Sequence, residues 1–301
     1  MTAFRGANAK QLAPGYMRVV MNSYKERPLE GPKLTNKKTS KRAWEEDFPV
    51  AGFGSLVTKP EGGSVTYQDI IEGSAKRYLF RTDGLGFRIT HEMKSDNLYG
   101  NIGAKMSTAL GRSVRNSQEF MMHSILNNCT NTGTQYLGWD GLPLLSTAHV
   151  LLRAGSTIAN KPSTDIDFGL LPLQAAVEHF HALVDESNMP IVFLPRLVVH
   201  SIGDHWMVNQ VLKTPSLPGT NLNDVNQIKN EGLTGHLSHY LTDPDAWFVL
   251  ADNHDMNYFL REAPSFTAGD DFHSGDSLFK VIQRHGAGFG DYRGVYGSTG
   301  G

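Results

Sequence analysis

The stretch from Ser95 to Asn128 constrains the fold of this chain more than any other segment. Apolar residues recur at every fourth position along most of it, and side chains four residues apart lie one above the other on an α-helix. No proline interrupts the stretch, and Asp96 is placed to cap its start. The predicted helix is far longer than the usual three turns, and only one of its sides is apolar. It is therefore predicted to be a spine on which other elements pack. The apolar stripe consists of Leu98, Ile102, Met106, Leu110, Val114, Met121 and Ile125.

Three glycines, Gly100, Gly103 and Gly111, lie in the predicted spine. A glycine inside a helix costs up to about 1 kcal/mol relative to alanine. It also lets another backbone come close, because no Cβ atom stands in the way. These three positions therefore allow another segment to pack closely against the spine.

The composition excludes several classes of protein. A chain of 301 residues with 40% hydrophobic residues can build one large or two ordinary domains. No apolar run approaches the roughly 20 residues of a membrane-spanning helix, and the first residues lack the apolar core of a secretion signal. The net charge of −2 provides no overall field for capturing nucleic acid. Cys129 is the single cysteine, which excludes an internal disulfide and fits a reducing compartment; we predict that it is a small buried hydrophobe.

The first 50 residues do not have the pattern of an independent domain. Between Tyr24 and Arg42 seven residues are basic and two are acidic, and Pro28, Gly31 and Pro32 break any helix there. A segment with so few apolar residues cannot offset its own ordering entropy. It is either a solvated tail or an arm that becomes ordered on another surface.

Residues 51–92 have the pattern of an extended hairpin. Short alternating runs predict strands, and we place turns at Glu72–Ser74 and at Asp83–Gly84. A two-stranded hairpin is only marginally stable in water without a surface to lie on. We therefore expect roughly the first ninety residues to pack on a neighbouring copy of the chain rather than on their own chain.

The remainder of the chain alternates between predicted helices and strands. Loop residues 155–164 are predicted to separate two domains. An amphipathic helix is predicted at residues 165–185, and a shorter helix at residues 203–212. The apolar stripe of the first helix consists of Leu171, Ala175, Phe180, Leu183 and Val184. Strands are predicted at Gly141–His149, Pro190–His200, Asp245–Ala251, Tyr258–Arg261 and Ser277–Arg284.

Enzyme-like motifs in the sequence lack the partners that their chemistry needs. Gly275–Leu278 spells the block around the nucleophile of the GDSL esterases, but the nearby Asp270 and His273 precede Ser277 on the same turn. A nucleophile, its base and the acid that orients the base cannot form a triad from a single turn. We therefore predict that the chain is not an enzyme and has no catalytic, cofactor-binding or metal-binding residues. A hydrolase that uses Ser277 is the weaker alternative.

Six stretches occur in the order of a known family: Leu85–Glu92, Ile125–Asn128, Trp139–His149, Pro195–Val199, Thr242–Leu250 and Arg284–Gly297. Together they resemble the major capsid proteins of tailed bacteriophages, in particular the Mu-like prophage major head subunit family. The similarity extends from about residue 44 to the end of the chain. Leu145 and Val150 depart from that family, which often has phenylalanine and proline there, and these departures concern the subfamily rather than the fold.

The resemblance implies an α+β chain with the HK97-like capsid fold. It would divide the chain into an N-terminal arm at residues 1–50, an extended loop at 51–92, a peripheral domain with the spine helix at 93–162, an axial domain at 163–262, and C-terminal strands at 263–301 that complete the peripheral domain. This division agrees with an arm and a hairpin that have no core of their own.

The resemblance also implies a structural function, that of a major capsid protein from a phage or prophage. Such a protein assembles into the hexamers and pentamers of an icosahedral shell around double-stranded DNA. The implied partners are other copies of itself, a scaffold or maturation protease, a portal and a decoration protein. The implied location is the virion, after assembly in the cytoplasm of a bacterial host. A subunit of an encapsulin-like compartment is the alternative, because one fold can serve both functions.

The arm and the hairpin are expected to clasp neighbouring subunits. Aromatic residues would anchor them, and basic residues beside the hairpin would form charged pairs, each worth up to about 1 kcal/mol when exposed. The candidate contact residues are Trp44, Phe48, Phe53, Tyr67, Lys76, Arg77, Tyr78, Phe80 and Arg81.

Overall fold

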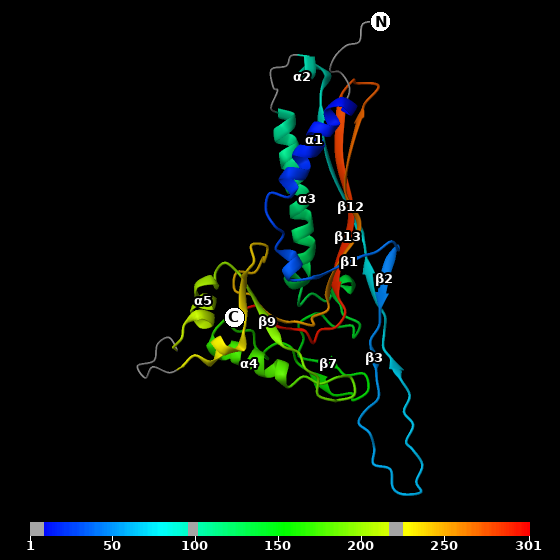
Figure 1. The fold of residues 1–301 in the computed structure, drawn as a ribbon, viewed down its shortest axis with the longest axis vertical. Helices are drawn as coiled ribbons and strands as arrows, with labels where there is room; N and C mark the ends of the chain where they lie inside the picture. Colours follow the sequence, from blue (N-terminus) through cyan, green and yellow to red (C-terminus); the bar gives the residue numbers. More distant parts are fainter. Residues whose placement is uncertain (1–8, 96–101, 217–224) are drawn as a thin grey trace. The chain divides into compact units, whose positions relative to one another are not determined.

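The computed structural model describes residues 9–95, 102–216 and 225–301, and it contains both helices and strands, as predicted. The chain divides into two compact units (Figure 1). Unit 1 contains residues 1–43, 79–122 and 258–287, and unit 2 contains residues 44–78, 123–257 and 288–301. Within the described ranges, no helix is long and apolar enough to span a bilayer.

Unit 1 is a four-stranded sheet with two helices packed on one face (Figure 1). The strand order is β1 (Asn36–Thr39), β12 (Met256–Asp270), β13 (Ser277–Phe289) and β6 (Arg81–Ile89). Strand β6 pairs antiparallel with β13, with Phe87 opposite Phe279. The helices are α1 (Ala9–Tyr24) and α3 (Ile102–Asn127), and the short elements are η1 (Gly31–Lys33) and α2 (His91–Ser95). The core between helices and sheet contains Val20, Leu110, Val114 and Val281.

Helix α3 confirms the predicted spine from Ile102 onward. The stripe residues Leu110, Val114 and Ile125 are buried, as the spacing requires. Gly103 and Gly111 also behave as predicted: a Cβ atom at Gly103 would overlap the Tyr16 ring, and one at Gly111 would overlap the Val20 carbonyl oxygen. The predicted cap Asp96, together with Leu98 and Gly100, lies outside the described residues.

The expectation that the first ninety residues pack on a neighbouring copy rather than on their own chain is wrong for residues 9–43, and also for β6, which pairs with β13. Helix α1 buries Val20 against α3, Leu34 is fully buried, and Gly31 lies against the side chain of Met122. The sequence argument relied on the basic composition of residues 24–42. It overlooked the helix that precedes them, because Pro14 lies inside that helix.

Unit 2 contains a second four-stranded sheet, in the order β10 (Thr234–Leu237), β9 (Pro195–His200), β11 (Trp247–Ala251) and β14 (Val295–Ser298). Strands β10 and β9 are parallel, and β11 runs antiparallel to both β9 and β14. Trp247, Val198 and Phe180 lie in its core. The unit also contains η2 (Thr134–Tyr136), α4 (Leu170–His181), α5 (His205–Lys213) and η3 (Gln227–Glu231). The predictions of a strand at residues 245–251 and a helix at residues 203–212 are thus confirmed to within two residues.

Two predictions in unit 2 are wrong in detail. The strand expected at Gly141–His149 is limited to β7 (His149–Val150), which pairs with β8 (Thr157–Ile158). Helix α4 buries Leu173, Ala176, Val177 and Phe180, whereas Leu171 is 74% exposed. The prediction is thus wrong at Leu171 and Ala175, which are exposed, but Phe180 and Leu183 of the predicted stripe are buried. The helix is also shorter than predicted, because it starts at Leu170 and ends at His181.

The hairpin region begins with two short strand pairs. Strand β2 (Trp44–Asp47) pairs with β5 (Lys76–Leu79), and β3 (Val50–Ala51) pairs with β4 (Ile71–Glu72). Residues 52–70 form a loop without strand pairing, which we call the 52–70 loop, and its turn lies at Pro60–Gly63, where Gly62 has a φ of 77°.

Both turns predicted for this region are therefore wrong. Glu72 belongs to β4 and pairs with Val50, and Asp83 and Gly84 lie inside β6, opposite Gln283 and Ile282. Gly84 was taken for a turn residue, but it lies within the ladder between β6 and β13, where a Cβ atom would make only ordinary contact with Ile282.

Candidate functional site

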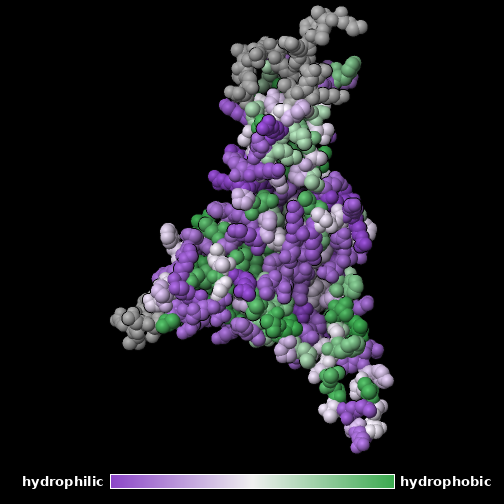
Figure 2. Space-filling view, in the orientation of Figure 1, coloured by the Kyte–Doolittle hydropathy of each residue, from purple (hydrophilic) through white to green (hydrophobic). Residues whose placement is uncertain are grey.

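The 52–70 loop carries several large apolar side chains that are exposed to solvent. Figure 2 shows apolar residues spread along it. Leu56 is 99% exposed and Tyr67 is 91% exposed, although side chains of this size are normally removed from water. The other large apolar residues exposed on the loop are Phe53, Val57, Val65 and Ile70. A group of exposed large apolar side chains on one loop indicates a site of protein association.

A groove separates the two limbs of the 52–70 loop. It has a volume of about 340 Å³ and is lined by residues 53–59 on one limb and 64–68 on the other. One hydrogen bond crosses it, from the Gly54 N–H to Oε1 of Gln68 at 2.9 Å. Because few polar contacts hold the limbs together, their side chains are free to pack against a partner.

The base of the 52–70 loop is held by Arg153, which lies in the turn between β7 and β8. Its Nε donates to the Gly52 carbonyl at 3.1 Å, and a second guanidinium nitrogen donates to the Asp69 carbonyl. The Ser187 hydroxyl also donates to Gly52, at 3.1 Å. The backbone N–H of Arg153 donates to the Glu186 carbonyl at 3.1 Å. One guanidinium therefore fixes the start and the end of the loop to the body of unit 2.

Replacing Arg153 by alanine is expected to loosen the base of the loop without unfolding unit 2. The exposed guanidinium contributes two hydrogen bonds, so amide hydrogen exchange in β3 and β4 should accelerate about tenfold. Ser187→Ala is the matched control, because it removes one bond to the same carbonyl, and it should have a smaller effect. An Arg153→Ala variant that exchanges no faster than Ser187→Ala would contradict the role assigned to this guanidinium.

The predicted contact residues fall into two groups. Trp44, Phe48, Phe53 and Tyr67 are exposed, and so are Arg77 and Arg81. The structure brings Arg77 to Glu46, with 2.5 Å between Nη2 and Oε1, and places its guanidinium 4.9 Å from the centre of the Trp44 ring.

The other three predicted contact residues face their own chain. Lys76 is buried and donates to the Gln135 carbonyl at 3.0 Å, and this burial lowers its pKa. Tyr78 is also buried, which raises the pKa of its hydroxyl. Phe80 is half-buried against Phe259, with 5.8 Å between ring centres. Sequence reasoning did not select Leu56 or Val57, although an apolar pair just before the Pro60 turn would have been the signal.

The sequence motifs near Trp139 and Asp291 meet in the interior of unit 2. His149 Nδ1 lies 2.5 Å from Oδ2 of Asp140, and the His149 ring stacks on Tyr292 with 3.6 Å between ring centres. The buried Asn160 amide donates to the Leu144 carbonyl at 2.7 Å. These residues are buried and hydrogen-bonded to one another, so their role is to hold unit 2 together.

The enzyme-like motif does not form an activated nucleophile. Ser277 is buried, and its hydroxyl donates to Oδ1 of Asp270 at 2.8 Å rather than to the histidine of a serine-hydrolase triad. Cys129 is buried as predicted, and burial raises the pKa of its thiol to about 12. Across residues 9–95, 102–216 and 225–301, no three His, Cys, Asp or Glu side chains are placed to hold a metal ion.

A search of family models decides the identity. Residues 74–298 match the model of the family described as phage capsid protein. The chain belongs to the phage capsid protein family. It is a phage capsid protein, a subunit of the shell, as the resemblance implied.

Solved structures agree with this assignment at the level of fold. A structure from Mycobacterium phage Che8 superposes with a TM-score of 0.58 and 12% identity, over 91% of this capsid protein and 93% of that chain. The procapsid of bacteriophage JBD30 superposes with a TM-score of 0.55 and 13% identity, over 97% of this capsid protein and 75% of that chain. The capsid of cyanophage P-SCSP1u superposes with a TM-score of 0.58 and 11% identity, over 88% of this capsid protein and 85% of that chain. The fold is the HK97-like fold. A search of curated proteins gives no match.

A virus-like particle from Pyrococcus furiosus also has this fold, with a TM-score of 0.51 and 9% identity over 95% and 98% of the two chains. The fold therefore does not separate a phage head from another shell of this type. The family match is to phage capsid protein, which favours the phage head over an encapsulin-like compartment.

Proposed function

We propose that this capsid protein forms the hexamers and pentamers of an icosahedral shell around double-stranded DNA, and that the 52–70 loop clasps a neighbouring subunit. The observation that carries the proposal is the near-complete exposure of Leu56 and Tyr67 on a loop whose base is fixed by Arg153. Burying an exposed side chain of this size contributes about 1.5–3 kcal/mol. A shell repeats every such contact many times, so the modest gain from one loop is sufficient.

The exposed candidates are the contact residues that we propose for this clasp: Trp44, Phe48, Phe53, Tyr67, Arg77 and Arg81. In the proposed division, residues 1–50 are the N-terminal arm, 51–92 the extended loop, 93–162 and 263–301 the peripheral domain, and 163–262 the axial domain. The arm in this scheme includes α1, which packs on α3 of its own chain.

We also make proposals about the enclosed DNA, the place of assembly, the partner proteins and the subfamily. A net charge of −2 is compatible with enclosing DNA without binding particular sequences. We propose assembly in the cytoplasm of a bacterial host, together with a scaffold or maturation protease, a portal and a decoration protein. We also propose that the protein belongs to the Mu-like subfamily and catalyses no reaction.

The clasp is tested by shortening the loop in the full-length protein. The carbonyl oxygens of Gly52 and Asp69 both contact one guanidinium, so a short Gly-Ser linker can replace residues 53–68 without straining the base. We expect the shortened chain to keep its circular dichroism spectrum and its urea midpoint, and to remain unassembled under conditions in which the wild type forms shells. Negative-stain electron microscopy and sedimentation velocity measure the difference.

Two full-length variants separate the apolar contact from loop length. A triple substitution of Leu56, Val57 and Tyr67 by serine should block assembly as the shortened loop does. Replacing Thr58 and Thr66, which are exposed on the same loop, by alanine should leave assembly intact. Closed shells formed by the shortened chain would refute the clasp.

A further inference from the structure

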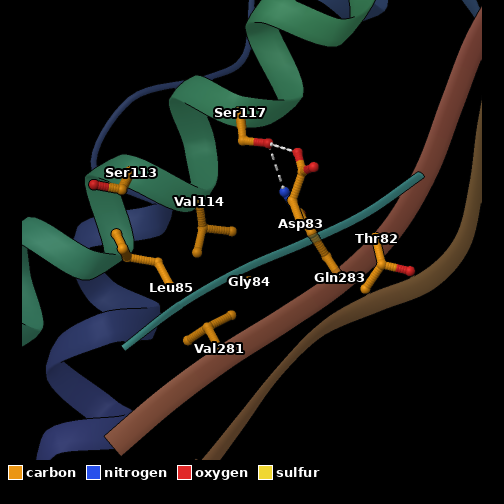
Figure 3. Close-up of a pocket in the computed structure, with 9 residues that line it drawn as sticks. All are labelled: Thr82, Asp83, Gly84, Leu85, Ser113, Val114, Ser117, Val281 and Gln283. Atoms are coloured by element: carbon orange, nitrogen blue, oxygen red, sulfur yellow. Dashed lines mark hydrogen bonds between the residues drawn. The ribbon is translucent and has the colours of Figure 1, made fainter. Parts of the chain in front are cut away.

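One hydrogen-bonded network in unit 1 connects helices α1 and α3 with three strands of the sheet, β6, β12 and β13. Its members are Tyr24 on α1, Asp83 on β6, Ser117 and Gln118 on α3, Tyr258 on β12, and Gln283 and His285 on β13. We call it the Asp83 network. Figure 3 shows Ser117, Asp83 and Gln283 meeting between α3 and the sheet.

Two chains of donors in this network end on the same carboxylate oxygen. The Tyr24 hydroxyl donates to Gln118 at 2.8 Å, and Gln118 donates to Gln283 at 2.9 Å. Gln283 donates to the Ser117 hydroxyl at 3.1 Å, and Ser117 donates to Oδ2 of Asp83. Each link fixes the direction of the next, because a group that uses its donor on one side must accept on the other.

The second chain reaches the same oxygen through a histidine. His285 Nε2 lies 2.9 Å from Oδ2 of Asp83, and its Nδ1 lies 3.0 Å from the Tyr258 hydroxyl. An ionised carboxylate can only accept, so His285 carries its proton on Nε2 and accepts from Tyr258 at Nδ1. The charge of Asp83 thus orients every donor in the network.

The packing around Asp83 makes this polar contact important for strand β6. Strand β6 is at the edge of the sheet and has β13 as its strand partner. A cavity of about 410 Å³ lies beside it, lined by Leu85, Val114 and Val281 among others (Figure 3). Leu85 is 55% exposed, so apolar packing between β6 and α3 is incomplete there. The hydrogen bond from Ser117 to Asp83 bridges the two elements at the end of this gap.

These contacts give Asp83 control over how β6 packs against α3. We propose that Asp83 is an acid-sensitive latch that holds β6 against α3, and that loss of its negative charge releases β6 from the rest of unit 1. A protonated Asp83 carries an O–H donor on one carboxyl oxygen and keeps only a neutral acceptor on the other. The hydrogen bonds from Ser117 and His285 then lose their charge assistance, so both chains are weakened at the point where they end.

The charged and titratable groups near Asp83 come from each element packed around it. Arg81 on β6 contacts Oδ1 of Asp83 through its Nε at 3.1 Å, but its side chain is exposed and this pair adds little. The others are His285 on β13, Tyr258 on β12, Tyr24 on α1, and Arg115 and Glu119 on α3.

Protonation of His285 and protonation of Asp83 both lower the stability of the folded protein when the pH falls. Burial lowers the pKa of His285, so the folded protein keeps it neutral at a pH where the unfolded chain protonates it, and stability declines below roughly pH 6.5. Burial alone raises the pKa of Asp83. The hydrogen bonds from Ser117 and His285 and the charge of Arg81 lower the pKa by more than burial raises it, so its net shift is downward. Its contribution is therefore present above roughly pH 4 and is lost as the pH falls through the lowered folded-state pKa.

Amide hydrogen exchange of the full-length protein tests the latch. Protection is expressed relative to the intrinsic rate at each pH, and β12 serves as the reference strand within the same unit. In the wild type we expect protection of β6 relative to β12 to fall about tenfold or more between pH 5 and pH 3, because the lowered pKa of Asp83 keeps it charged until the pH is below roughly 4. Asp83→Ala should show this loss already at pH 7.

Two serines that line the cavity, Ser117 and Ser113, provide a test variant and its matched control. Ser117→Ala removes one donor from Asp83, whereas Ser113 lines the same cavity one turn away and donates to the Ala109 carbonyl of its own helix at 3.1 Å. Ser117→Ala should weaken the protection of β6 at pH 7, and Ser113→Ala should not. If Asp83→Ala does not fold, this pair decides. Equal protection in the two serine variants would overturn the proposal, and so would a wild type in which β6 and β12 lose protection together.

Discussion

Replacing Glu119 by alanine is expected to lower the free energy of unfolding by roughly 3–5 kcal/mol. Its side chain is completely buried in α3, and its two carboxylate oxygens accept the backbone N–H groups of Glu30 and Gly31, at 2.7 and 2.9 Å. Arg115 lies one turn earlier, 3.9 Å from the same carboxylate. Without this acceptor, two backbone N–H groups of the segment between α1 and β1 lose their hydrogen bonds to the spine helix.

Urea unfolding of the full-length protein measures this effect. Glu119→Gln keeps one acceptor oxygen but turns an amide donor toward a backbone N–H, so it should fall between alanine and the wild type. Glu178→Ala is the matched control, because that glutamate is exposed on α4 and its loss should change stability by less than about 0.5 kcal/mol. A Glu119→Ala variant as stable as Glu178→Ala would show that the buried carboxylate does not anchor the segment.

A side chain at Gly111 is expected to separate α1 from α3. A Cβ atom there would overlap the Val20 carbonyl oxygen and lie 3.0 Å from Cβ of Ser23, and backbone atoms in a helix cannot move aside cheaply. We expect Gly111→Val to destabilise the protein by roughly 3 kcal/mol, because the overlap far exceeds the gain in helix propensity over glycine.

Gly15 provides the opposite case on the partner helix. It is exposed, and a Cβ atom there would meet nothing within 4 Å. Gly15→Ala should therefore raise the free energy of unfolding by about 0.5–1 kcal/mol. The shift of the urea midpoint in opposite directions is the test. Two variants that both destabilise, or a neutral Gly111→Val, would contradict the close crossing of the helices.

The sequence predicted best where one physical pattern extended over many residues. The spine helix followed from an apolar residue at every fourth position, and the close helix crossing followed from Gly103 and Gly111. The family followed from an ordered series of short motifs, none of which is sufficient alone. Such patterns survive tertiary context because each combines many small preferences.

Features that depend on a partner distant in the sequence were missed. Nothing near Glu119 indicates that its carboxylate is buried, because its backbone donors lie 88 and 89 positions away. Asp83 next to a glycine suggested a turn, since only the facing strand shows that both residues belong to a ladder. The apolar residues Leu56 and Val57 were passed over because they are too few to form a strand pattern.

Residues 52–70 have no strand pairing, and this affects how identical subunits can form a closed shell. Subunits at different places on a curved surface meet their neighbours at unequal angles. A ladder would have to break backbone hydrogen bonds to follow such changes. A loop that is held at its base by Arg153 and crossed by the hydrogen bond from Gly54 to Gln68 can bend at little enthalpic cost, and so supplies a geometric tolerance that a paired hairpin lacks.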